Sequence, residues 1–93
     1  MISEDTVLAL KDGSSFRGLG ETGLMLRLEG GQLYTLNETG AAFVRHIDGT
    51  RSFGTLLDAV SEEFEVPDRS ELAADMSALT EDLEREGLIV RRT

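Results

Sequence analysis

The sequence predicts an α+β domain, in which a small three-stranded antiparallel sheet is followed by three helices. Strand-like patterns lie before Asn37, and helix-like patterns lie after it. Strands and helices that are segregated in this way are typical of domains whose helices cover one face of an antiparallel sheet. Short connections make the second and third helices a helix-turn-helix-like pair, so the expected architecture is compatible with a winged helix. A chain of 93 residues is long enough for one such domain, and we expect residues 1–93 to form it.

Strand signals occupy the first third of the chain. The strand-like segments are Thr6–Leu10, a possible piece at Ser15–Leu19, Leu24–Leu28 and Gln32–Leu36. Leucines alternate through Leu24–Leu28, which is the period of a half-buried strand. Two glycines in the sequence EGG after this strand predict a hairpin turn, because glycine readily adopts the positive φ that tight turns need.

Three helices are predicted downstream, each preceded by a residue that can cap it. They are expected at Glu38–Ile47 after Asn37, at Phe53–Glu65 after Ser52, and at Arg69–Glu86 after Asp68. Gly87 is expected to end the third helix, and residues 88–91 to form a closing strand. The predicted core consists of Phe43, Ile47, Leu56, Val60, Phe64, Leu72, Met76, Leu79 and Leu83.

Composition narrows the possible functions. The chain has 18 acidic and 9 basic residues, a net charge of −9, which is unfavourable for binding nucleic-acid phosphates. It has no cysteine, so disulfides, thiolate metal sites and cysteine nucleophiles are excluded. No apolar run is long enough to span a membrane, and the N-terminal residues lack the pattern of a signal peptide. We therefore expect a cytoplasmic protein.

Several short motifs occur in an order that resembles the PqqD-like family. The sequence YTLNETGAAF runs from Tyr34 to Phe43, and Asp48-Gly49 follows it. Residues 62–66 read EEFEV, and the third helix then contains Asp75-Met, Leu79, Leu83 and Gly87-Leu-Ile at matching spacings. The resemblance covers roughly residues 24–90. Members of this family are recognition elements for RiPPs, which are peptides made on the ribosome and then modified.

The resemblance implies a non-catalytic protein that binds the leader region of a precursor peptide and presents it to a maturation enzyme. That enzyme would be a protease, a cyclase or a radical enzyme, and a lasso-peptide pathway is one candidate. In this family the leader adds as an antiparallel strand to the third strand of the sheet, beside the third helix. Carried over to this chain, the peptide-binding residues are Gln32, Leu33, Tyr34, Thr35, Leu36, Asp75, Ala78, Leu79 and Asp82.

The residue types themselves are consistent with such a role. The stretch from Gln32 to Leu36 alternates, so that Tyr34 and Leu36 share one face while Leu33 and Thr35 share the other. An edge strand offers unpaired amides and carbonyls to an extended peptide. On the third helix, the spacing of Asp75, Ala78 and Asp82 places them on one flank. This flank is either a solvated acidic face or a wall that pairs with Lys or Arg of the leader.

No catalytic, metal or cofactor site is expected. Residues 18–23 match the spacing GxGxxG, but a strand follows them where a nucleotide-binding unit needs a helix. His46 is the sole histidine and has no partners at ligand spacing. The alternatives left open are a winged-helix DNA-binding domain and a generic protein-interaction adaptor. The acidic residues of the third helix count against the former.

Overall fold

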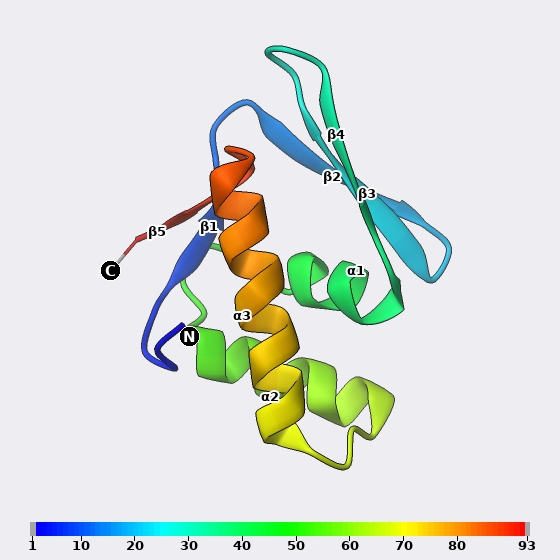
Figure 1. Ribbon diagram of the computed structural model, residues 1–93, viewed down its shortest axis with the longest axis vertical. Coiled ribbons are helices and arrows are strands. Elements are labelled where there is room, and N and C mark those ends of the chain that lie inside the picture. The colour runs from blue at the N-terminus through cyan, green and yellow to red at the C-terminus, as the bar shows by residue number, and fades with distance from the viewer. Residues whose placement is uncertain (1, 93) are drawn as a thin grey trace.

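The computed structural model describes residues 2–92, and within that range the chain forms five strands and three helices (Figure 1). In chain order these are β1 (Leu8–Leu10), β2 (Ser14–Leu19), β3 (Thr22–Arg27), β4 (Gln32–Leu36), α1 (Glu38–Arg45), α2 (Phe53–Phe64), α3 (Arg69–Arg85) and β5 (Ile89–Arg91). None of the helices in this range is both long enough and apolar enough to cross a membrane.

The main sheet has three antiparallel strands in the order β2-β3-β4, so β3 is central and β4 is an edge. All three helices lie on one side of it, and α1 packs against each strand and also against α2 and α3 (Figure 1). The predicted fold class, a three-stranded antiparallel sheet followed by three helices, is confirmed.

One predicted strand lies outside this sheet. The segment predicted at Thr6–Leu10 forms β1, which pairs antiparallel with β5 at the other end of the chain, Leu8 opposite Arg91 and Leu10 opposite Ile89. The third member of the main sheet is β2, where the sequence indicated only a possible strand piece. The predicted closing segment after Gly87 is confirmed as β5.

The register of β3 and β4 decides which side chains are buried. Met25 pairs with Tyr34, and Gly23 pairs with Leu36. Met25 is fully buried and Leu36 is 5% exposed, whereas Leu33 on the opposite face is 56% exposed. The alternating leucines of β3 therefore do not mark its buried side, because the inward position between them is held by methionine.

Each helix begins at its predicted cap. The Asn37 side chain accepts a hydrogen bond from the Gly40 amide at 2.8 Å, and Ser52 accepts one from the Thr55 amide at 3.3 Å. Asp68 accepts from the first free amides of α3, including that of Ser70 at 3.0 Å. The helices end one or two residues earlier than predicted.

The core forms where α1 and α2 meet. The rings of Phe43 and Phe53 pack edge to face with their centroids 5.8 Å apart, and both side chains are fully buried. Of the nine predicted core residues, Phe64 and Leu79 are only partly buried and lie at the margin of the cluster. For Leu79 the reason is that its side chain borders an open groove, described below.

The contrast between two leucines of α3 gives a stability prediction. Leu83 is fully buried, so Leu83→Ala should lower the free energy of unfolding by about 2–5 kcal/mol. Leu79 is half-buried, so Leu79→Ala should cost less, about 1–2 kcal/mol. Urea denaturation of both variants measures the difference. Equal losses would contradict the marginal placement of Leu79.

Candidate functional site

The outer edge of β4 carries backbone groups that the sheet does not use. The Leu28 amide donates to the Gly13 carbonyl at 2.8 Å, which identifies Gly13 and Leu28 as a hydrogen-bonded pair in the β2–β3 register. Hydrogen-bonded and non-hydrogen-bonded pairs alternate along antiparallel strands. Successive residues of the central strand β3 therefore bond alternately to β2 and to β4. Leu26 therefore bonds to β2, and its partner on β4, Leu33, directs its amide and carbonyl away from the sheet.

The same alternation applies two residues further along β4. Leu24 also bonds to β2, so its partner Thr35 presents its backbone groups at the open edge. Tyr34 and Leu36, in contrast, bond to β3. The edge of β4 thus offers two donors and two acceptors in the spacing that an extended peptide can match.

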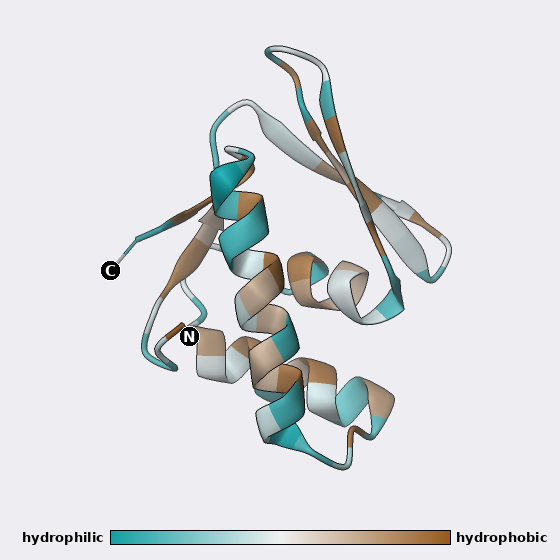
Figure 2. Ribbon diagram, viewed as in Figure 1, coloured by the Kyte–Doolittle hydropathy of each residue, from teal (hydrophilic) through white to brown (hydrophobic). Residues whose placement is uncertain are grey.

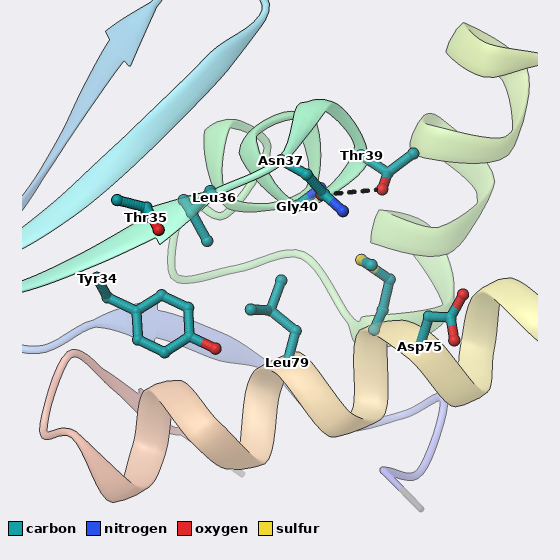
Figure 3. Close-up of a pocket in the computed structure, with 9 residues that line it drawn as sticks. Tyr34, Thr35, Leu36, Asn37, Thr39, Gly40, Asp75 and Leu79 are labelled. Carbon is teal, nitrogen blue, oxygen red and sulfur yellow. Dashed lines mark hydrogen bonds between the residues drawn. The ribbon is translucent and has the colours of Figure 1, made fainter.

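A groove runs beside this edge, with a volume of about 440 Å³ (Figure 3). It lies between β4, the first turn of α1 and the middle of α3. Its walls are Tyr34, Thr35, Leu36, Asn37, Thr39, Gly40, Asp75, Met76 and Leu79. In Figure 3 the side chains of Tyr34 and Leu36 from β4 and Leu79 from α3 lie around the same space.

Gly40 sets the depth of the groove at its centre. A Cβ atom at this position would lie 3.3 Å from Leu79 Cδ2 and 3.1 Å from Asn37 Oδ1. The absence of a side chain lets the first turn of α1 come close to α3 while the space between them stays open. The same Cβ atom would lie 3.6 Å from Leu36 Cδ2, so the backbone at Gly40 is close to β4 as well as to α3.

The structure brings only part of the predicted site together. Five of the predicted residues line the groove: Tyr34, Thr35, Leu36, Asp75 and Leu79. Leu33 lies on the opposite face of the sheet, and Ala78 is exposed on α3 outside the groove lining. The prediction missed the contribution of Asn37, Thr39, Gly40 and Met76. Asn37 was explained as a helix cap and Met76 as a core residue, and no sequence signal marked Thr39 or Gly40 as part of a surface.

Gln32 and Asp82 lie beyond one end of the groove, in two polar bridges from β4 to α3. The Tyr34 hydroxyl donates to Asp82 Oδ2 at 3.3 Å, and Gln32 Nε2 donates to Glu86 Oε1. Asp82 also accepts from Arg85 at 2.8 Å. The bridges join strand and helix near the C-terminal end of α3, while the other end of the groove is open.

Burial raises the pKa of Tyr34 above its usual value, and the nearby negative charges of Asp82 and then Glu86 raise it further. The hydrogen bond to Asp82 acts in the same direction, since it requires the neutral phenol as donor. The positive charge of Arg85 opposes these effects. Tyr34 is therefore a neutral hydrogen-bond donor throughout the physiological range.

The charge of α3 gives the DNA-binding alternative no support. Its acidic residues, with the cap and the residue that follows, are Asp68, Glu71, Asp75, Glu81, Asp82, Glu84 and Glu86. Both arginines of the helix are in ion pairs, Arg69 with Glu4 and Asp58, and Arg85 with Asp82. Hydrophilic residues lie at both ends of α3 (Figure 2). The phosphate backbone of a nucleic acid that approached this helix would meet an excess of negative charge.

The described part of the chain contains no cluster of three or more His, Asp or Glu residues arranged to hold a metal ion. His46 lies 3.3 Å from Glu63, away from the groove, and Arg51 contacts its other ring nitrogen. The groove instead combines an open strand edge, apolar side chains and the carboxylate of Asp75, an arrangement suited to binding an extended peptide.

Fold and groove together define a small α+β domain of the winged-helix-like class, with one sheet edge left open beside a helix. The chain belongs to the PqqD family, since the family model described as Coenzyme PQQ synthesis protein D matches residues 22–89.

The fold also occurs in a solved structure. The chain is similar to a solved structure described as TbiB1 in complex with the TbiA(beta) leader peptide, with a TM-score of 0.73. The match covers 86% of this chain and 93% of that chain at 20% sequence identity, a level at which the likeness concerns the fold. No curated protein sequence matches the chain.

Tyr34 is the sole tyrosine and the chain has no tryptophan, so its ionisation can be followed directly by ultraviolet absorbance. We expect a folded-state midpoint above the ordinary value of 10.0. Because the folded-state pKa is the higher one, stability should fall as the pH rises from the unfolded midpoint through the folded midpoint.

Two variants separate the causes of this shift. Asp82→Asn should lower the midpoint, because it removes a negative charge and the carboxylate acceptor, whereas Arg85→Gln should raise it. The urea-unfolded chain serves as the reference. Coincident folded and unfolded titration curves would contradict the contact between Tyr34 and Asp82.

Proposed function

We propose that residues 1–93 act as one RiPP recognition element, a domain without catalytic activity of its own that binds the unmodified leader of a ribosomal precursor peptide. The leader adds to β4 as a fourth strand and places alternate side chains in the groove against α3. The observation that carries this proposal is the outward direction of the Leu33 and Thr35 backbone groups beside a groove lined by Met76 and Leu79. Family membership, and a similar fold in a protein described as a leader-peptide complex, support it.

The arrangement of β4 assigns roles to the bound side chains. In an antiparallel pair, residues directly opposite each other project to the same face. Leader residues opposite Tyr34 and Leu36 therefore enter the groove, while the residue between them, opposite Thr35, lies on the outer face. Leu33, at 56% exposed, can pack only against outward-facing leader side chains.

Energetics make the groove necessary for binding. Ordering a flexible peptide costs about 1–2 kcal/mol per residue. Each strand hydrogen bond contributes only about 0.5–1.5 kcal/mol net. The deficit is met by burying apolar leader side chains against Leu79, Met76 and Leu36. The carboxylate of Asp75 at the groove wall then favours leaders with a facing Lys or Arg.

Delivery to a separate enzyme is the second part of the proposed role. We infer that the partner is a maturation enzyme, a protease, cyclase or radical enzyme, which acts on the core of the precursor while this domain holds the leader. The groove and the outer face of the sheet lie on opposite faces of β4, so a bound leader leaves the outer face accessible to a partner.

The open edge can be tested with two substitutions at one position. Leu33→Pro removes an outward amide that the sheet does not use, and proline is tolerated at such edge positions. Leu33→Ala keeps the amide and removes the side chain. The ligand is the leader half of the precursor peptide whose gene lies nearest to the gene for this chain. We expect Leu33→Pro to weaken binding of this peptide at least about tenfold, and Leu33→Ala to weaken it much less.

Calorimetric titration measures both affinities, and circular dichroism checks that the variants fold. Gly18→Pro places the same ring on the opposite edge of the sheet, in β2, and should leave binding unchanged. Equal binding by the wild-type chain and a folded Leu33→Pro variant would refute strand addition at β4.

A further inference from the structure

A second pocket continues the groove past the end of the sheet. Its volume is about 260 Å³, and Thr39 and Asp75 line both this pocket and the groove. It lies between the first turn of α1, the loop that joins α2 to α3, and the N-terminal half of α3. In Figure 3, Thr39 and Asp75 are at the end of the groove that is remote from Tyr34.

The pocket has an apolar floor and an acidic rim. Val66, Pro67 and Leu72 supply the apolar surface, Leu72 being 5% exposed and Val66 half-buried. Figure 2 shows a hydrophobic segment in the loop between α2 and α3. The rim carries the carboxylates of Asp68 and Glu71, together with that of Asp75.

These carboxylates are largely uncompensated by positive charge. Hydrogen bonds from the Ser70 hydroxyl and from the Glu71 and Ser70 amides hold the pKa of Asp68 below its usual value. Among the residues that the structure describes, Glu71 and Asp75 form no ion pair. A ligand with an apolar side chain and a neighbouring positive charge therefore complements the pocket.

The direction of β4 determines which part of a bound peptide reaches this pocket. β4 runs from Gln32 towards α1, and the strands of this sheet pair antiparallel, the slightly more stable arrangement. A peptide strand added antiparallel to β4 runs in the opposite direction to β4. The N-terminal side of the peptide therefore emerges at Leu36, next to the pocket.

The separation of the two sites sets the spacing along the peptide. The α3 residues of the second pocket are centred about four positions before those of the groove. At the rise of an α-helix this is roughly 6 Å, which about two extended residues span.

We propose that the second pocket binds the segment of the leader immediately N-terminal to its added strand, taking an apolar side chain flanked by Lys or Arg. This assignment rests on the proposed function. The seated residue lies about two positions before the one opposite Leu36. A leader is thus selected by a motif longer than the strand that pairs with β4.

The test uses fifteen-residue peptides that the wild-type chain selects from a displayed random library, so no cognate leader is needed. Fluorescence anisotropy compares their affinity for the wild-type chain with that for Val66→Ser, Glu71→Lys and Leu33→Pro. Glu62→Lys is the matched control, since Glu62 is an exposed acid on α2 outside both pockets. Methyl NMR of Val66 and Leu72 follows peptides trimmed at either end.

We expect Val66→Ser to weaken binding about threefold to tenfold and Glu71→Lys to weaken it in a salt-sensitive manner. Glu62→Lys should have little effect. Trimming the N-terminus of a peptide should abolish the methyl shifts of Val66 and Leu72. Since Glu71 is exposed, its variant tests the pocket even if Val66→Ser destabilises the fold.

Two other results would overturn the assignment, in distinguishable ways. Peptides that are sensitive to Leu33→Pro but indifferent to both pocket variants would leave strand addition intact and exclude the second pocket. The same exclusion follows if C-terminal rather than N-terminal trimming removes the methyl shifts. A library that yields no binder sensitive to Leu33→Pro would contradict the proposed function itself.

Discussion

Met25 pairs with Tyr34 across the β3–β4 hairpin, and this register decides both what the sheet buries and what it leaves free. Side chains alternate along a strand, so a slip of one residue would exchange the faces of β4. Leu33 and Thr35 would then point at the helices, and Tyr34 would lose its contact with Asp82. The same slip would turn the backbone groups of Leu33 and Thr35 inward. Groove and open edge thus depend on a single pairing.

The helices were predictable because their signals are local. Asn37, Ser52 and Asp68 cap amides within three residues of themselves, so the sequence around each cap contains the necessary information. The hairpin between β3 and β4 is local as well. Its buried side was not predictable from the leucine pattern, because Leu24, Met25 and Leu26 are all apolar and alternation gives no preference between the two faces.

The features that escaped prediction depend on contacts between distant parts of the chain. β1 pairs with β5, which lies about eighty residues later, and nothing near Leu8 indicates that partner. The groove likewise requires three elements to meet. Leu79 has the spacing of a core residue, but Gly40 provides no side chain to cover it, so it remains partly open. Its neighbours Thr39 and Met76 become part of a surface only when α1 and α3 pack together.

The two ends of the groove differ in chemistry, and this difference is what gives an open strand edge any selectivity. Backbone groups at Leu33 and Thr35 are the same for every peptide, so the edge alone would accept almost any extended chain. At one end, the bridges from Tyr34 to Asp82 and from Gln32 to Glu86 are partly or fully exposed hydrogen bonds. Such bonds contribute little net stability, so a peptide group that supplies equivalent polar contacts can displace them at small cost.

At the other end, Met76, Leu79 and the connected second pocket offer apolar surface bordered by carboxylates. An extended peptide can match both ends of the groove if it places polar side chains near the bridges to α3 and apolar side chains near Met76, Leu79 and the second pocket. The reversed peptide, or one shifted by a single residue, places polar groups against Leu79 and leaves buried donors unpaired, which costs more than a missing contact. In the proposed function, the asymmetry of the groove therefore fixes the direction and register of a bound leader, while the backbone pairing along β4 adds a contribution that is independent of sequence.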